Sequence, residues 1–367
     1  MAQFIRLAIN LRIGHNNDTP AVVAAICEKA RGQIMFSYNK SASKSDLIFA
    51  ADIGGTHLRA AIVGRDGQIH YRLKQPTPQA EKPDGIVHAI VDAAHEGERH
   101  TAGRGVQISA VSIAVPGTVN FEDGVVIKAP NVPCLDGFGL TAALESELKW
   151  PTILENDANA AAIGEMWQGA GRGYNSLVCV TLGTGVGGGI ILDGKLWRGA
   201  DGSAGEIGHL GVDPFGGVPC ACGSHGCLEV YASATAIVRM TGEARPRYPD
   251  SILHASEGLT SETVYHAGLK GDELALEAFR RMGVYLGIGL ASLVNLLNPE
   301  IIVIGGGLSN GWELFEQHMH RQVIERAFPL SARSVKITRA ECNDDAGFLG
   351  AARLAFVGRQ SHAAKSE

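Results

Sequence analysis

The chain has 367 residues, of which 45% are hydrophobic and 19% charged, and its formal net charge is −6. This length allows two domains with buried cores, and the acidic balance argues against general nucleic-acid binding, which needs a basic excess. Met1–Ile13 is interrupted by Arg6 and Arg12, so it lacks the apolar core of a secretory signal. Two uncharged stretches, Tyr174–Leu192 and Met282–Asn298, are too rich in glycine or too short to predict a membrane span.

The seven cysteines are unevenly spaced. Three lie close together, and the other four are dispersed; in chain order they are Cys27, Cys134, Cys179, Cys220, Cys222, Cys227 and Cys342. A secreted disulfide framework has an even, regular set, which this is not. We therefore expect a reducing, cytoplasmic location and one local metal site.

Residues 1–45 read as an N-terminal extension without an assigned function. They contain the polar runs Asn16–Pro20 and Ser41–Ser45, and Ala21–Ala30 is compatible with a short helix. None of these residues forms a pattern that points to chemistry. The ordered fold is expected to begin at Asp46.

From Asp46 onward, one unit of structure occurs twice. It consists of a strand, a glycine turn, a second strand and an Asp-Gly hairpin signal leading to a third strand. The first copy comprises Leu47–Ala51, Asp52–Thr56, Leu58–Val63, Asp66–Gly67 and Gln68–Leu73; the second comprises Leu177–Leu182, Gly183–Gly185, Gly188–Leu192 and Asp193–Gly194. Such a repeat predicts two related lobes with a cleft between them, which the glycine turns would face.

Strands and helices alternate along the rest of the chain, which predicts an α/β protein. The expected helices are Gly85–His95, Thr141–Lys149, Ala158–Trp167, Ala232–Met240, Ser261–Ala267 and Glu273–Asn298, the last stopped by Pro299. The further strands are Val106–Val115, Pro151–Glu155 and Glu300–Ile304.

Two nucleotide-binding patterns are matched only superficially. Gly183-x-Gly185-x-x-Gly188 fits the dinucleotide fingerprint, but a β run follows where that motif requires a helix. Gly189-x-x-x-x-Gly194-Lys195 resembles a P-loop, but Leu196 replaces the required hydroxyl residue and the pair lies on a hairpin. Neither motif is accepted.

The glycine turns are better interpreted together, as a phosphate cradle. Glycine turns expose backbone N–H donors, threonine adds a hydroxyl, and a neighbouring carboxylate can hold Mg²⁺ through water. A third turn, Gly305–Gly307, ends a buried strand where adenine or ribose can approach. The candidate nucleotide-binding residues are Asp52, Gly54, Gly55, Thr56, Gly183, Thr184, Gly185, Gly305 and Gly306. Taken alone, each turn is better explained as an ordinary structural turn.

Asp157 stands where a strand ends and a helix begins, the edge of an α/β sheet at which ligands usually bind. Phosphoryl transfer to an alcohol needs a base near the hydroxyl, and a carboxylate can accept that proton. Position alone is also compatible with Asp157, or Asn156, merely capping the helix Ala158–Trp167.

Cys220, Cys222 and Cys227 supply three thiolates in one glycine-rich loop, and His209 or His225 could complete a set of four. Three Cys and one His suit tetrahedral Zn²⁺ in a structural role. A redox pair or buried free thiols are the alternatives. Glu206 and Glu229 flank the loop, where they either contact a polyol or remain solvated at the surface.

These residues resemble the ROK family (repressors, ORFs and kinases), and in particular its bacterial glucokinase-like members. The resemblance covers roughly Asp46 to Phe356. It rests on five stretches: Asp52-Ile-Gly-Gly-Thr-His-Leu-Arg59, Glu155-Asn-Asp-Ala-Asn-Ala160, Leu182-Gly-Thr-Gly-Val-Gly-Gly-Gly189, Ala204-Gly-Glu-Ile-Gly-His209 and the cysteine loop Cys220-Ala-Cys-Gly-Ser-His-Gly-Cys-Leu-Glu229. Two departures concern the sugar-side loops: Cys134–Leu135 replaces the common Gly-Trp, and Asn120 replaces the usual Asp.

The resemblance implies an actin-like (ribonuclease H-like) two-lobed ATPase fold with a central cleft and a zinc-pinned loop. It implies a small lobe over 46–157, completed by a C-terminal helix over 345–358, and a large lobe over 158–344. Asp157 inherits the role of catalytic base. The implied sugar contacts are Asn131, Asn156, Glu206, His209 and Glu229, and the implied zinc ligands are His209, Cys220, Cys222 and Cys227.

The activity that the resemblance implies is transfer of a phosphoryl group from Mg·ATP to a hexose 6-hydroxyl, most specifically to glucose. Fructose, allose, N-acetylglucosamine or N-acetylmannosamine are alternative substrates, and relatives suggest a homodimer or homotetramer. A sugar-responsive transcription regulator is the alternative of another class. Against it, residues 1–45 are too short for a convincing winged helix-turn-helix, and Asp157 and the glycine turns are retained.

Overall fold

The computed structural model describes residues 46–79, 81–102, 107–254 and 258–363. The N-terminal extension, including the possible helix Ala21–Ala30 and Cys27, lies outside the described residues.

The first of two five-stranded sheets has the strand order β3-β2-β1-β4-β7. Its strands are β1 (Asp46–Ile53), β2 (His57–Gly64), β3 (Ile69–Pro76), β4 (Gln107–Val115) and β7 (Thr152–Asn156). β1 pairs antiparallel with β2 and parallel with β4, and β4 pairs parallel with β7. The nearly continuous burial of β1 and β4 is typical of a sheet covered on both faces.

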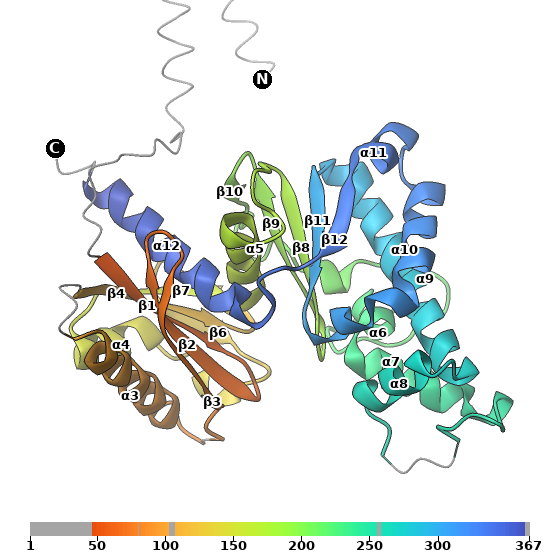
Figure 1. Ribbon diagram of the computed structural model, residues 1–367, viewed down its shortest axis with the longest axis horizontal. Coiled ribbons are helices and arrows are strands. Elements are labelled where there is room, and N and C mark those ends of the chain that lie inside the picture. The colour runs from red at the N-terminus through yellow and green to blue at the C-terminus, as the bar shows by residue number, and fades with distance from the viewer. Residues whose placement is uncertain (1–45, 80, 103–106, 255–257, 364–367) are drawn as a thin grey trace, which may run out of the picture. The chain divides into compact units, whose positions relative to one another are not determined.

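Helices cover both faces of this sheet (Figure 1). On one face α3 (Asp84–Thr101) and α4 (Leu140–Leu148) join a core with strand residues such as Phe49. On the other face α12 (Ala346–Ala363) contributes Phe348 and Phe356 to a second core with Ile48. A separate hairpin follows β4 and consists of β5 (Thr118–Asn120) and β6 (Val125–Lys128).

The second sheet has the order β10-β9-β8-β11-β12, the same succession as the first. Its strands are β8 (Leu177–Leu182), β9 (Val186–Leu192), β10 (Lys195–Leu196), β11 (Ile301–Gly305) and β12 (Lys336–Arg339). In both sheets three antiparallel strands are followed by two parallel ones. This confirms the repeated unit predicted from the sequence.

The second sheet is also covered on both faces (Figure 1). α5 (Asp157–Gln168) packs on one face, and the remaining helices build the largest core on the other. Those helices are α6 (Glu229–Ala232), α7 (Ala234–Ala244), α8 (Ser261–Leu269), α9 (Glu273–Leu297), α10 (Trp312–Arg326) and α11 (Pro329–Ser334). Short 3₁₀ turns are η1 (Pro133–Leu135), η2 (Ile207–His209), η3 (Arg245–Arg247), η4 (Gly307–Gly311) and η5 (Asn343–Asp345). Within the described ranges no helix combines the length and apolarity that crossing a bilayer requires.

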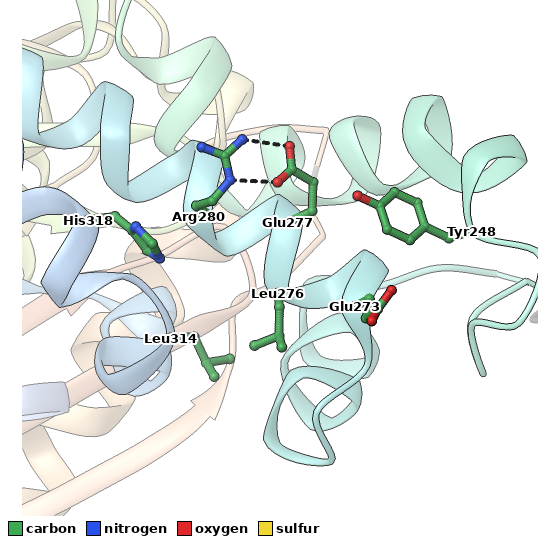
Figure 2. Close-up of a pocket in the computed structure, with 7 residues that line it drawn as sticks. All are labelled: Tyr248, Glu273, Leu276, Glu277, Arg280, Leu314 and His318. Atoms are coloured by element: carbon green, nitrogen blue, oxygen red, sulfur yellow. Dashed lines mark hydrogen bonds and ion pairs between the residues drawn. The ribbon is translucent and has the colours of Figure 1, made fainter.

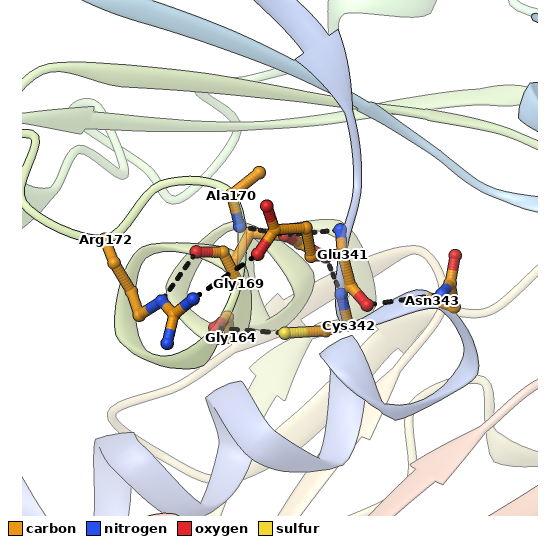
Figure 3. A network of polar contacts seen from close by, with 8 residues as sticks. Gly164, Gly169, Ala170, Arg172, Glu341, Cys342 and Asn343 are labelled. Atoms are coloured by element: carbon orange, nitrogen blue, oxygen red, sulfur yellow. Dashed lines mark hydrogen bonds and ion pairs between the residues drawn. The ribbon is translucent and has the colours of Figure 1, made fainter.

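The chain passes from β12 to α12 through residues 340–345, and Glu165 of α5 fastens this crossover. The Glu165 side chain is fully buried. Its carboxylate accepts hydrogen bonds from the N–H groups of Ala170 (2.9 Å), Glu341 (3.1 Å) and Cys342 (2.8 Å). Figure 3 shows the surrounding contacts, in which the Cys342 thiol also reaches the Gly164 carbonyl oxygen. A helix of the second sheet thereby holds the segment that leads back to the first.

We expect Glu165→Ala to lower the free energy of unfolding by about 2–4 kcal/mol, because one buried and two part-buried N–H groups lose their acceptor. Denaturant unfolding measures this. Glu300→Ala is the matched control, because Glu300 accepts the N–H groups of Asn175 and Ser176 at an exposed site where water can replace it. Equal losses in the two variants would contradict the anchoring role.

Candidate active site

The turn between β1 and β2 has its carbonyl groups occupied. The Gly54 carbonyl oxygen accepts the Thr77 hydroxyl (2.6 Å), the Gly55 oxygen accepts Gln79 Nε2 (3.3 Å), and the Thr56 oxygen accepts the Thr77 N–H (2.9 Å). In the part of the chain that the structure describes, the N–H groups of Gly55 and Thr56 donate to no acceptor. The turn therefore presents unpaired donors.

The turn between β8 and β9 is arranged in the same way. The Gly183 carbonyl oxygen accepts the Ala234 N–H (2.8 Å), the Thr184 oxygen accepts the Thr235 hydroxyl (2.9 Å), and the Gly185 oxygen accepts the Gly183 N–H (2.9 Å). The N–H groups of Thr184 and Gly185 donate to nothing among the described residues. Successive free N–H groups in a turn form an anion-binding concavity, so both turns are suited to phosphate oxygens.

The third glycine turn lies against the second one. Gly306 has φ +83°, and a side chain there would come within 2.4 Å of the Leu182 carbonyl oxygen, the last residue of β8. Only glycine allows this approach. The Ser309 N–H and hydroxyl both bond to the Gly306 oxygen, at 3.0 and 2.7 Å, and this closes the turn.

A cavity of about 360 Å³ opens beside this third turn, and we call it the α8–η4 cavity. Its volume lies in the range of about 300–1,000 Å³ that is usual for small-molecule sites. Its lining is part aromatic and part polar: Ser261, Glu262, Tyr265, His266, Phe279, Gly307, Leu308, Asn310 and Gly311. Such a lining is compatible with a flat base and a ribose.

Asp157 is the first residue of α5, but it is not the residue that caps the helix. Asn156 is the cap, because its Oδ1 accepts the Asn159 N–H at 3.0 Å. The Asn156 amide also donates to the Gly117 carbonyl oxygen (2.9 Å) and to Asp157 Oδ1 (3.2 Å). Asp157 therefore does not serve as the cap. Oδ2 of Asp157 has no hydrogen bond among the described residues.

The glycine run of β9 lets two segments approach the strand. A side chain at Gly187 would lie 3.1 Å from Ala158 Cβ, next to Asp157, and one at Gly188 would lie 2.7 Å from the Gly205 carbonyl oxygen, next to Glu206. Gly188, the last glycine of the pattern that resembled a dinucleotide fingerprint, therefore serves packing together with Gly187. This packing brings the start of α5 and the segment carrying Glu206 close to the second turn.

Two other carboxylates, those of Asp52 and Glu206, repel the carboxylate of Asp157. Burial raises the pKa of Asp157, the Ala158 N–H opposes that rise, and the charge of Glu206 adds to it. Burial and then the charge of Asp157 raise the pKa of Asp52 to about 7, against the lowering effect of Arg59. Asp52 stands directly before the first turn, so Asp157 lies within electrostatic range of both Asp52 and Glu206. A cation bound here would relieve the repulsion.

The cysteine loop brings four ligand atoms together. The donor atoms of His209, Cys220, Cys222 and Cys227 all lie within 4.8 Å of one another. Cys222 Sγ is 3.7 Å from Cys227 Sγ, and Cys220 Sγ is 3.7 Å from His209 Nδ1. A tetrahedral zinc with Zn–S bonds of about 2.3 Å has edges of about 3.6–3.8 Å, so the residues fit Zn²⁺.

His209, and not His225, belongs to this group. With Nδ1 toward the sulfurs, His209 turns Nε2 toward Glu206, 3.9 Å from its Oε2. The loop therefore aims one imidazole edge at the carboxylates near Asp157. A zinc ion would fix that orientation, because a metal ligand loses its rotational freedom.

Glu229 and Asn131 each lie against one of the first two turns. Glu229 Oε2 accepts the Val186 N–H at 2.9 Å, and a side chain at Gly185 would reach within 2.3 Å of the same oxygen. Asn131 is exposed, and a side chain at Gly55 would lie 3.1 Å from its Cβ. Of the sequence-predicted residues, these two thus border the turns.

The Asn120 departure has a local explanation. Asn120 Oδ1 accepts the N–H groups of Glu122 and Asp123, at 3.1 and 3.0 Å, and its amide donates to the Asp123 carboxylate at 2.7 Å. It builds the turn of the β5–β6 hairpin. Aspartate can make the same two backbone contacts, so the substitution leaves the turn possible.

A second hollow, of about 380 Å³, lies between α9 and α10 and away from these residues (Figure 2). It is lined by Tyr248, Glu273, Leu276, Glu277, Arg280, Leu314 and His318. Arg280 donates to both oxygens of Glu277, at 2.6 and 2.8 Å, so this guanidinium is already paired. None of the sequence-predicted site residues lines this hollow.

The sequence did not predict the residues that support the site or line the α8–η4 cavity. Glu155 is buried and paired with Arg198, and Tyr265 and Phe279 line the α8–η4 cavity. Glu155 belongs to the Glu-Asn-Asp stretch but carries no signal of its partner, which is 43 residues away. The cavity residues come from helices whose patterns predict only packing.

The repeated strand order and the paired glycine turns define the actin-like class of nucleotide-binding folds. Within that class the chain belongs to the ROK family, which residues 48–357 match. It is 38% identical over 306 residues to a glucokinase of Halalkalibacterium halodurans, a match that covers 82% of this chain and 92% of the relative.

Solved structures similar to this chain include a kinase and a transcriptional regulator. One is a ROK family glucokinase from Streptomyces griseus in complex with glucose and AMPPNP, with a TM-score of 0.70 and 36% identity, covering 84% of this chain and 98% of that one. The other is a ROK family transcriptional regulator, with a TM-score of 0.76 and 27% identity, covering 84% of this chain and 77% of that one.

The raised pKa of Asp52 predicts the direction in which stability changes with pH. Because the pKa of about 7 lies above the unfolded value of 3.8, the folded state binds a proton that the unfolded state releases, and stability falls as the pH rises from 3.8 to about 7. We expect Asp52→Asn to melt above the wild type at pH 8 and to melt equally near pH 3.5. Thermal melts across this range, without nucleotide, measure the difference. A variant less stable than the wild type at pH 8 would contradict the electrostatic argument.

We expect Cys222→Ser to lose bound zinc and to melt at a lower temperature, because metal binding contributes to folding. Elemental analysis of the purified chain measures the metal content. Cys134→Ser, outside the cluster, should retain it. Unchanged zinc in the Cys222 variant would disprove the ligand assignment.

Proposed function

We propose that this protein is an ATP-dependent hexokinase that transfers the γ-phosphoryl group to the 6-hydroxyl of glucose. The observation that carries the proposal is the position of Asp157. Its carboxylate is within electrostatic range of Asp52, which precedes the first turn, and of Glu206. Asp157 begins the helix packed on β9, the strand that follows the second turn, and both turns have free N–H donors. The similarity to glucokinases over most of the chain supports the same activity.

The reaction follows from these groups. The free N–H groups of the two turns bind the phosphate oxygens of ATP, and the α8–η4 cavity receives the nucleoside. Asp157 accepts the proton of the hexose 6-hydroxyl as that oxygen bonds to the γ-phosphorus and the bond to the bridging oxygen of ADP breaks. The raised pKa of Asp157 makes it a stronger base than an ordinary exposed carboxylate.

Two metal ions belong to the proposal. Mg²⁺, held with ATP through Asp52, neutralises phosphate charge when bound. Zn²⁺ is structural and is held by His209 and the three clustered cysteines. With its other ring nitrogen, His209 joins Glu206, Glu229, Asn131 and Asn156 in binding the sugar hydroxyls, since carboxylate and amide groups form strong hydrogen bonds to a polyol.

A coupled assay of ADP release against a sugar panel tests the substrate. The panel holds glucose, fructose, allose, N-acetylglucosamine and N-acetylmannosamine, and we expect the highest kcat/KM for glucose. A higher value for another sugar would keep the kinase and reject glucose. No ADP release with any of them would reject the kinase.

A sugar-responsive regulator is the second candidate function, because the similar regulator structure has the TM-score of 0.76. The retained Asp157 and the unpaired N–H groups favour turnover over sensing. DNA binding without ADP release would reverse this order.

We expect the enzyme to work in the cytoplasm as a homodimer or homotetramer. All cysteines in the described ranges are free, and a cluster of thiolates needs a reducing compartment. Analytical ultracentrifugation measures the assembly.

Replacing the base tests the chemistry. We expect Asp157→Ala to reduce kcat by about 10²–10⁴-fold while glucose still binds, because general-base catalysis contributes about that much. Calorimetry measures glucose binding. Asp157→Asn, which keeps the contact to the Ala158 N–H, should be as inactive. A near-normal kcat in either variant would exclude Asp157 as the base.

A further inference from the structure

An ion pair joins Glu155, two residues before Asp157, to Arg198, whose side chain is 27% exposed. Glu155, near the end of β7, is only 2% exposed. Its Oε2 accepts two hydrogen bonds from Arg198, from Nε at 2.9 Å and from Nη2 at 2.6 Å. A buried carboxylate needs such a partner, because leaving it unpaired carries a large desolvation cost.

The other oxygen of Glu155 holds two residues close to Asp157 in the chain, Asn156 and Asn159. Glu155 Oε1 accepts the Asn156 N–H at 3.0 Å and the Asn159 side-chain amide at 3.1 Å. Asn156 in turn caps α5 and contacts the Asp157 carboxylate. The orientation of the Glu155 carboxylate therefore determines where the first turn of α5, and with it Asp157, is placed.

Arg198 also belongs to the segment that carries the sugar-side residues. Its main-chain carbonyl oxygen accepts the Ala204 N–H at 3.0 Å and closes the loop that leads to Glu206. Its guanidinium carbon lies 4.7 Å from the centre of the Phe121 ring, which comes from the β5–β6 hairpin. One residue thus contacts three segments of the site.

We propose that Arg198 is a positioning residue for the sugar side of the active site. Through Glu155, it keeps Asp157 at a fixed position relative to the loop that carries Glu206. The proposal rests on the hexokinase function proposed above. Arginine suits this role because its planar fork gives two donors to one carboxylate while its face stacks on an aromatic ring, which lysine cannot do.

Steady-state kinetics of Arg198→Met test the proposal. We expect kcat to fall by about tenfold to a hundredfold, as misplacement of a reacting group by about 1 Å does, and the KM for glucose to rise. The KM for ATP should stay unchanged, because Arg198 contacts neither glycine turn. Arg198→Lys, with one donor group in place of the fork, should lie between the two.

Arg280→Met is the matched control (Figure 2). Arg280 also uses Nε and Nη2 on a carboxylate, that of Glu277, but it lies away from the site. Its kcat and both KM values should equal those of the wild type. A loss of kcat in this control as large as in Arg198→Met would overturn the proposal, because the effect would then belong to any lost ion pair.

A double variant, Glu155→Gln with Arg198→Met, separates positioning from stability. Glutamine keeps an acceptor for Asn156 and Asn159 and removes the unpaired charge, so the melting temperature should recover toward that of the wild type. We expect kcat to stay low, because nothing then joins residue 155 to the loop. A double variant with wild-type kcat and glucose KM would overturn the proposal. A wild-type chain inactive on every hexose would reject the proposed function and this proposal with it, whereas an active wild type with an unaffected Arg198→Met rejects this proposal alone.

Discussion

Carboxylates and unpaired N–H groups are gathered in one place, and the rest of the structure keeps them there. Asp157 and its two neighbouring carboxylates, Asp52 and Glu206, repel each other, and this repulsion adds to burial in raising the pKa values of Asp52 and Asp157. In the turns beside them the carbonyl oxygens accept hydrogen bonds, whereas successive N–H groups donate none among the described residues. Both features are unfavourable without a partner. A magnesium–nucleotide complex supplies the missing cation and acceptors, so the instability of the empty site is what the proposed substrate relieves.

Helix α5 connects the candidate site to the two sheets. Its first residue is Asp157, and its Glu165, two turns later, holds the crossover from the second sheet to α12. β9 packs on α5 through glycines, and α12 packs both on α5 and on the first sheet. The proposed base is therefore mounted on a helix that contacts both halves of the repeat. Arg198 adds a direct tie from the sugar-side loop to the strand that ends at Asp157.

Much of the site could be predicted from local patterns. The glycine turns, the Asp157 position and the cysteine loop are short-range signals, since their residues lie within a few positions of one another. Which histidine, His209 or His225, joins the cysteines and which residue, Asn156 or Asp157, caps α5 needed the structure, because each depends on which side chain faces which group. Glu155–Arg198 and the α8–η4 cavity could not be predicted, because their members are far apart in the chain.

The α/β class, the repeated unit of strands and glycine turns and the membership of the ROK family could be predicted from consecutive residues, because periodicity, turn chemistry and motif spacing are local. Tertiary structure alone decided which groups meet: α5 with α12, Glu165 with Cys342, Arg198 with Glu155. The reason is physical. Local conformation depends on neighbours in the chain, whereas the partner of a buried charge depends on packing, which brings residues together regardless of their separation.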